Sequence, residues 1–103
     1  MFMNLYTEYA NNGQSFIIRV KGCFDFSLMA GFREAYGGLE QQVKTITVDF
    51  RETENIDSAG LGMLLNLRKS AGGGKVNIRL IHCRDEIKEQ LVAANFEQFF
   101  EIS

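Results

Sequence analysis

Residues 45–74, TITVDFRETENIDSAGLGMLLNLRKSAGGG, decide the fold because a strand pattern is followed there by a helix pattern. In residues 45–50 every second side chain is apolar, which is the period-2 pattern of a half-buried strand. Residues 58–71 carry leucines at helical spacing, and the three glycines at 72–74 end the helix. This stretch predicts one strand-to-helix unit of an α/β sheet.

The residues before this unit predict a hairpin and a first helix. Residues 3–9 and 15–21 are expected to be strands, and Asn11-Asn12-Gly13 between them is typical of a hairpin turn. Apolar side chains then recur at spacings of three and four through residues 28–43, which predicts a helix. Gly37-Gly38 interrupts it at a cost of about 1 kcal/mol per glycine relative to alanine, so the helix either bends or stops early there.

The residues after the unit predict one more strand and one more helix. Residues 76–80 alternate like a strand, and residues 84–94 have helical periodicity, with Asn95 as the cap. Residues 96–102 fit either a short helix or an edge strand. Strands separated by helices run parallel, so we expect one α/β domain, residues 1–103, with a mixed, mostly parallel sheet of four to five strands, an N-terminal hairpin and three to four helices.

Composition excludes several classes of protein. The 103 residues are 46% hydrophobic and 12% aromatic, which is typical of one folded domain and not of a disordered chain. The longest apolar runs are far shorter than the roughly 20 residues that span a membrane. Eleven basic and thirteen acidic residues give a net charge of −2, which argues against direct nucleic-acid binding. The amino end has no basic start and no apolar block, so we expect no secretion signal and a cytoplasmic protein.

The cysteines and the histidine predict no metal site. Cys23 and Cys83 lie far apart in the sequence, and we expect both to be reduced thiols. One histidine and two separate cysteines are too few for a closed zinc site, which needs four ligands at short spacings. We therefore expect neither a structural metal nor a cofactor.

The candidate site lies where the helix of residues 58–71 begins. In open α/β sheets, ligands and partners bind beyond the carboxyl ends of the strands, and either Asp57 or Ser58 can cap the helix start there. The free N–H groups and the helix dipole at such a position also favour a phosphate. The simpler interpretation is a helix cap with no further role. Gly60 and Gly62 in the first turns indicate either close approach of a partner or tight packing on the sheet.

This stretch resembles a known signature. Residues 57–65, Asp57-Ser58-Ala59-Gly60-Leu61-Gly62-Met63-Leu64-Leu65, resemble the signature of STAS domains of the anti-sigma-factor antagonist type. Residues 22–25 are similar to the family's G-x-x-D at the end of the second strand, and residues 48–50 to the strand before the signature. Residues 95–102 resemble its closing segment. The resemblance covers nearly the whole chain and implies a STAS-like α/β fold.

The resemblance implies a switch and not an enzyme. Such proteins bind an anti-sigma factor that is also a serine/threonine kinase, and this releases the sigma factor. The kinase would phosphorylate Ser58, and a serine phosphatase of the PP2C type would remove the phosphate. The implied partner-binding residues are Asp25, Asp57, Ser58, Ala59, Gly60, Gly62 and Met63. Met63 is expected to be exposed, because Leu61, Leu64 and Leu65 are taken to fill the inner face of the helix.

Charge gives this switch a physical basis. A phosphate adds about −1.5 to −2 charges at pH 7, next to Asp57 and near Asp25 if that strand reaches the same edge. Two unit charges about 5 Å apart repel by roughly 1 kcal/mol in water and by several times that when desolvated. Because each 1.4 kcal/mol is tenfold in affinity, we expect about a hundredfold loss of partner binding with little backbone change.

The chain also departs from the family pattern. Ala59 stands where many relatives have a second serine, so Ser58 has no adjacent competitor for the phosphate. Thr53 and Asn55 stand where relatives are often apolar, which makes the predicted loop of residues 51–56 more polar. The identity of the partner therefore stays open, and so does the oligomeric state, a monomer included.

Three functions other than this switch can be compared with the sequence. A STAS module that binds a nucleotide or lipid, or serves a lipid transporter as an accessory subunit, is the second hypothesis. A serine hydrolase with His82 as base would need a glycine two residues before the serine, where this chain has Ile56. Residues 72–75, Gly-Gly-Gly-Lys, lead from a helix into a strand, whereas a phosphate-binding P-loop leads from a strand into a helix.

Overall fold

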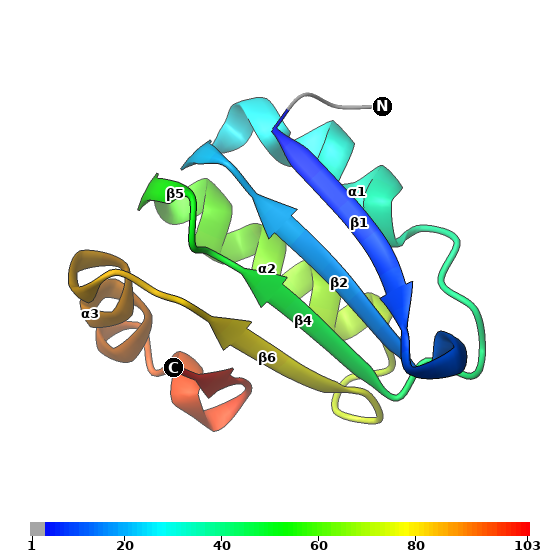
Figure 1. Ribbon diagram of the computed structural model, residues 1–103. Coiled ribbons are helices and arrows are strands. Elements are labelled where there is room, and N and C mark those ends of the chain that lie inside the picture. Colours follow the sequence, from blue (N-terminus) through cyan, green and yellow to red (C-terminus); the bar gives the residue numbers. More distant parts are fainter. Residues whose placement is uncertain (1–3) are drawn as a thin grey trace.

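A five-stranded sheet is the main element of the computed structural model, which describes residues 4–103 (Figure 1). In spatial order its strands are β1 (Leu5–Ala10), β2 (Ser15–Val20), β4 (Thr45–Asp49), β6 (Asn77–Ile81) and β7 (Glu101–Ile102). β1 and β2 are antiparallel, and every other neighbouring pair is parallel. The predicted mixed, mostly parallel sheet with an N-terminal hairpin is confirmed.

Helices cover one face of this sheet. α1 (Met29–Tyr36) and α2 (Ser58–Ser70) lie behind the sheet in Figure 1, and α3 (Asp85–Ala93) lies beside the β6 end. The inward side chains of the strands and the facing side chains of α1 and α2 form one apolar core. Its fully buried large side chains include Ile18, Phe24, Phe32, Ile46, Phe50, Leu64 and Leu80. No helix within residues 4–103 is both long enough and apolar enough to cross a bilayer.

A second, smaller sheet was not predicted. β3 (Gly22–Phe24) and β5 (Thr53–Ile56) pair in parallel beyond the ends of β2 and β4. Residues 22–25 are therefore not the end of the second strand, and part of the expected loop at residues 51–56 is a strand. Thr53 is fully buried, and its hydroxyl donates to the Val20 carbonyl oxygen at 2.7 Å. This bond satisfies the buried hydroxyl of a residue that the sequence placed in a polar loop.

The structure fixes two element boundaries that the sequence left open. The first helix stops at Tyr36, before Gly37-Gly38, although Val43 in the following connection is still buried in the core. The closing segment contains both predicted forms, a 3₁₀ turn, η3 (Phe96–Gln98), and the edge strand β7. The first strand begins at Leu5, and Met3, where it was expected to begin, lies outside the described residues.

The predicted hairpin turn is confirmed. The 3₁₀ turn η1 (Asn11–Gly13) joins β1 to β2, and its three residues have φ values of 52°, 57° and 86°. Asparagine and glycine are the residues that adopt this left-handed conformation at the lowest cost, which explains their place here. The turn sets the register of the hairpin, in which Ala10 pairs with Ser15.

Candidate functional site

The candidate site lies at the carboxyl ends of β3 and β5. Their parallel register pairs Phe24 with Ile56, so the next residues, Asp25 and Asp57, leave the two strands side by side. The Asp57 N–H donates to the Phe24 carbonyl oxygen at 3.4 Å. Each aspartate is followed by a helical turn, the 3₁₀ turn η2 (Phe26–Leu28) after Asp25 and α2 after Asp57.

Asp57 is the residue that caps α2. It has extended backbone angles, and its Oδ1 accepts a hydrogen bond from the Gly60 N–H at 3.0 Å. Its carbonyl oxygen accepts the Leu61 N–H, also at 3.0 Å, which closes the first turn. Ser58 is the first residue of the helix and is exposed. The capping role, which the sequence left open between the two residues, thus belongs to Asp57, and the Ser58 hydroxyl is not needed for it.

Asp25 is used in the same way on the neighbouring strand. Its Oδ1 accepts hydrogen bonds from the Ser27 hydroxyl and, at 3.0 Å, from the Ser27 N–H, which makes it the cap of η2. These bonds lower the pKa of the Asp25 carboxyl below its usual range, the hydroxyl bond most and the backbone bond second. The carboxylate is therefore ionised at neutral pH, and its Oδ1 is directed into its own turn.

The two glycines of the signature have different surroundings. A Cβ on Gly60 would lie 2.4 Å from the Phe24 carbonyl oxygen and 2.7 Å from Ile56 Cγ1, so this glycine lets α2 pack tightly against β3 and β5. A Cβ on Gly62 would meet nothing within 4 Å. Tight packing therefore accounts for Gly60 and not for Gly62. Ala59, which lies between Ser58 and Gly60, is half-buried.

The prediction that Met63 is exposed is wrong. Met63 is only 3% exposed, whereas Leu65, which was expected to face the core, is 41% exposed. The buried residues of α2 are Gly60, Met63, Leu64 and Leu67, which form the usual i, i+3, i+4, i+7 face. The spacing of the leucines alone predicts a buried face rotated by about one residue, because that prediction did not place Gly60 in the core. Met63 is therefore a core residue and cannot contact a partner.

Phe26 and Leu65 are exposed apolar residues near the site. Phe26 is 71% exposed in the turn that Asp25 caps. Leu65 lies seven residues after Ser58, and therefore on the same face of α2. From the sequence, Phe26 is one of three apolar residues near Asp25, with Phe24 and Met29, that fit either the core or a partner-binding patch, and Leu65 was expected in the core. The Asp-x-Ser capping pattern at residues 25–27 was the available signal that Phe26 sits in a fixed turn.

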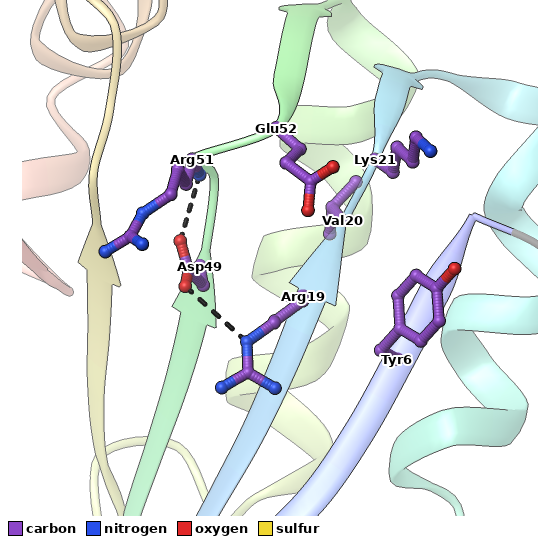
Figure 2. Close-up of a pocket in the computed structure, with 7 residues that line it drawn as sticks. All are labelled: Tyr6, Arg19, Val20, Lys21, Asp49, Arg51 and Glu52. Atoms are coloured by element: carbon purple, nitrogen blue, oxygen red, sulfur yellow. Dashed lines mark hydrogen bonds and ion pairs between the residues drawn. The ribbon is translucent and has the colours of Figure 1, made fainter.

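The helix-free face of the main sheet carries a small polar notch where β2 and β4 end (Figure 2). Within it, Asp49 accepts the Arg51 N–H at 2.9 Å and pairs with Arg19 Nε at 3.8 Å. The Lys21 and Arg51 side chains point away from the centre of the notch. Its volume of about 90 Å³ is well below the roughly 300–1,000 Å³ of typical small-molecule sites.

The remaining reactive side chains do not gather at Ser58. Arg51 Nη2 lies 2.9 Å from His82 Nε2 beyond the ends of β4 and β6. Burial raises the pKa of the half-buried Cys83 thiol to about 11, so it is protonated at neutral pH, and Cys23 is exposed on β3. Within residues 4–103 no three histidine, cysteine or acidic side chains are grouped so that they could hold a metal ion.

The fold and the site define a small α/β domain that presents a serine at the start of a helix. The family model for the STAS domain matches residues 6–103. A STAS-domain containing protein of Pseudomonas aeruginosa (strain UCBPP-PA14) is 41% identical over 92 residues, which are 89% of this chain and 91% of that protein. The chain therefore belongs to the STAS-domain family, as its sequence signature indicated.

Solved structures share this fold across different classes of protein. The anti-sigma factor antagonist SpoIIAA of Bacillus, in its unphosphorylated form, has a TM-score of 0.73 at 17% identity, over 96% of this chain and 86% of that chain. Its phosphorylated form has a TM-score of 0.66 at 17% identity, over 96% and 90%. A sulfate transporter family protein from Wolinella succinogenes has a TM-score of 0.74 at 19% identity, over 88% and 74%. At these identities the likeness shows the fold alone.

Proposed function

We propose that this chain is a phosphorylation-controlled protein-binding switch of the anti-sigma-factor antagonist type. The unphosphorylated protein binds an anti-sigma factor that is also a serine/threonine kinase, and so releases the sigma factor. The kinase phosphorylates Ser58, which ends binding, and a PP2C-type phosphatase restores it. The chain is a substrate in this cycle and not a catalyst.

The observation that carries the proposal is that Asp57, and not Ser58, caps α2. Asp57 caps α2 through Gly60, so the exposed Ser58 hydroxyl can be modified without removing the cap. A phosphate there would lie at the amino end of a 13-residue helix, whose dipole favours negative charge. Modification is thus compatible with an intact fold. SpoIIAA, a relative in fold, exists in an unphosphorylated and a phosphorylated form, which supports the same kind of switch here.

The effect on binding follows from the charges at the same edge. Asp57 precedes the phosphate directly, and Asp25 leaves the neighbouring strand beside it. The added charge of about −1.5 to −2 would repel both carboxylates once a partner excluded water. A dianion buried without a pairing group also carries a desolvation penalty of several kcal/mol. We expect phosphorylation to weaken partner binding by about a hundredfold or more.

The experiment combines phosphorylation with affinity. The anti-sigma factor kinase encoded in the same genome is purified and incubated with ATP and the wild-type chain, Ser58→Ala, or the control Ser70→Ala, which changes an exposed serine at the far end of α2. Intact mass should show one phosphate on the wild type and on Ser70→Ala, and none on Ser58→Ala. Calorimetry should show binding of Ser58→Ala and about a hundredfold weaker binding of the phosphorylated wild type.

Two results would contradict the proposal. The first is a phosphate that remains on Ser58→Ala. The second is equal affinity of the phosphorylated and unphosphorylated chains. A PP2C-type phosphatase added to the phosphorylated chain should restore both the original mass and the original affinity.

The second candidate is a binding module for a nucleotide or lipid, or an accessory subunit of a lipid transporter. It is supported by the fold shared with the sulfate transporter family protein. A thermal shift with ATP or with anionic lipid vesicles distinguishes it, because a ligand that binds only the folded chain raises its stability. The switch hypothesis predicts no shift with either.

A further inference from the structure

We propose that Phe26 is the apolar anchor by which the unphosphorylated chain docks into an apolar pocket of its kinase partner, and that Asp25 acts as a positioning residue for it. The inference rests on the proposed function and deepens it. It differs from the sequence-based expectation, in which Asp25 touches the partner directly. Three features of the structure support it: the exposure of Phe26, the rigidity of its turn and its place beside Ser58.

The exposure of Phe26 is unusual among the apolar side chains. It is 71% exposed, while the other large exposed apolar residues of the described chain lie between 39% and 43%. Two of those are partly covered by packing, Tyr9 on Phe16 and Phe99 beneath Arg68. Aromatic side chains, phenylalanine included, are enriched at the cores of protein interfaces relative to the rest of the surface. Phe26 therefore has the exposure of an interface residue and no packing role that explains it.

The turn that carries Phe26 is fixed on both sides. Phe24 before it is fully buried, and Leu28 after it is 7% exposed. The Leu28 N–H donates to the Asp25 carbonyl oxygen at 3.0 Å, and the Asp25 carboxylate accepts both Ser27 donors. An anchor held in this way loses little backbone freedom on binding, which favours affinity. Because Asp25 Oδ1 holds the turn through both Ser27 donors, we assign Asp25 the role of setting the direction of Phe26.

Phe26 and Ser58 belong to adjoining segments. The register of β3 and β5 sets Asp25 beside Asp57, and α2 packs on β3 so closely that Gly60 leaves no room for a Cβ next to the Phe24 carbonyl oxygen. Both η2 and the first turn of α2 lie at the same end of the molecule, beyond the carboxyl ends of the strands (Figure 1). One partner surface can therefore cover both.

An apolar anchor also explains how a phosphate would end binding. A docked aromatic side chain gains affinity only if neighbouring contacts keep water out of its pocket. A dianion on Ser58 would have to lose its hydration at the rim of that pocket, which is strongly unfavourable without a pairing cation. A chain that is phosphorylated on Ser58 can thus no longer dock Phe26 into the apolar pocket of the partner.

The test measures the affinity of unphosphorylated variants for the purified anti-sigma factor kinase. Phe26→Ala should weaken binding by at least about tenfold, while Tyr6→Ala, an exposed aromatic on the helix-free face of the sheet, should stay within about twofold of wild type. Asp25→Ala should lose part of the affinity, and Asp25→Asn should recover most of it, because asparagine caps a turn as well as aspartate does. Thermal unfolding of each variant checks that the fold is retained.

The outcomes separate the inference from the function on which it rests. If wild type binds and is phosphorylated on Ser58 but Phe26→Ala binds equally well, the anchor is wrong and the switch stands. If Asp25→Asn loses as much affinity as Asp25→Ala, the carboxylate touches the partner and the positioning role is wrong. If wild type neither binds nor is phosphorylated, the proposed function fails and the anchor fails with it.

Discussion

The two faces of α2 have opposite surroundings, although their residues alternate along one short segment. The inner face, with Gly60, Met63 and Leu64, is packed against the sheet so tightly that a single added carbon at Gly60 has no room. The outer face, with Ser58 and Gly62, meets solvent, and a carbon added at Gly62 would touch nothing. One face of the helix is thus committed to the fold. The other is free to change charge without disturbing the core.

The largest expected effect of breaking this division is that of Gly60→Ala. The new Cβ would lie 2.4 Å from a backbone oxygen, that of Phe24, which cannot turn aside as a side chain could. We expect the free energy of unfolding to fall by about 3 kcal/mol or more, at the upper end of overpacking effects. Urea unfolding followed by circular dichroism measures it. An unchanged midpoint would show that α2 does not pack on β3 as described.

Met63→Ala should have the next largest effect. Met63 is 3% exposed, and truncating a buried methionine leaves a cavity, so we expect a loss of about 2–3 kcal/mol in the free energy of unfolding. The matched control is Leu65→Ala on the outer face, which should change stability by less than about 0.5 kcal/mol. If the two variants exchanged these effects, the helix would be rotated to the phase that its leucines alone suggest.

The phase of α2 illustrates what the sequence could and could not predict. The helix itself and the strand of residues 45–50 were predictable because each shows a clear hydrophobic period over several residues. The parallel topology was predictable because helices separate the strands along the chain. The rotation of the helix was not predictable, since Gly60, one of its four buried residues, has no side chain to mark the inner face. Only the backbone of Phe24, 36 positions earlier, shows why that glycine faces inward.

The site was predictable to the same degree. The capping residue types predicted that the helix begins at Asp57 or Ser58, and Ser58 is its first residue, with an exposed side chain. The pairing of β3 with β5, which brings Asp25 beside Asp57, was not predicted, because strands of three and four residues are too short to show a period. Thr53 made β5 harder to predict, because a threonine in this position suggests a loop. Its hydroxyl is satisfied by the Val20 carbonyl oxygen, which is distant in sequence.

A smaller effect is expected from the cap between the two faces. Asp57→Ala removes the acceptor of the Gly60 N–H, and we expect a loss of about 1 kcal/mol in the free energy of unfolding, the typical value for an N-cap. Asp57→Asn keeps an acceptor and should stay close to wild type in the same urea titration. Ser58→Ala should also stay close to it, because Ser58 does not cap the helix. A larger loss for Ser58→Ala than for Asp57→Ala would mean that Ser58 caps the helix, which contradicts the structural basis of the proposed switch.

The smallest effect separates the two faces most sharply, because it has the opposite sign. Gly62→Ala makes the same chemical change as Gly60→Ala only two positions along, but its Cβ meets nothing within 4 Å. Alanine is favoured over glycine inside a helix, so we expect this variant to gain about 0.5–1 kcal/mol in the free energy of unfolding.

If the gain appears, the glycine at position 62 weakens the helix with no compensation inside the chain. Under the proposed function this glycine lies on the face that meets the partner, so the stabilised variant should bind the kinase less tightly than wild type. A loss of stability in Gly62→Ala would instead mean that this side of the helix is packed within the chain, and the distinction between the two faces would be wrong.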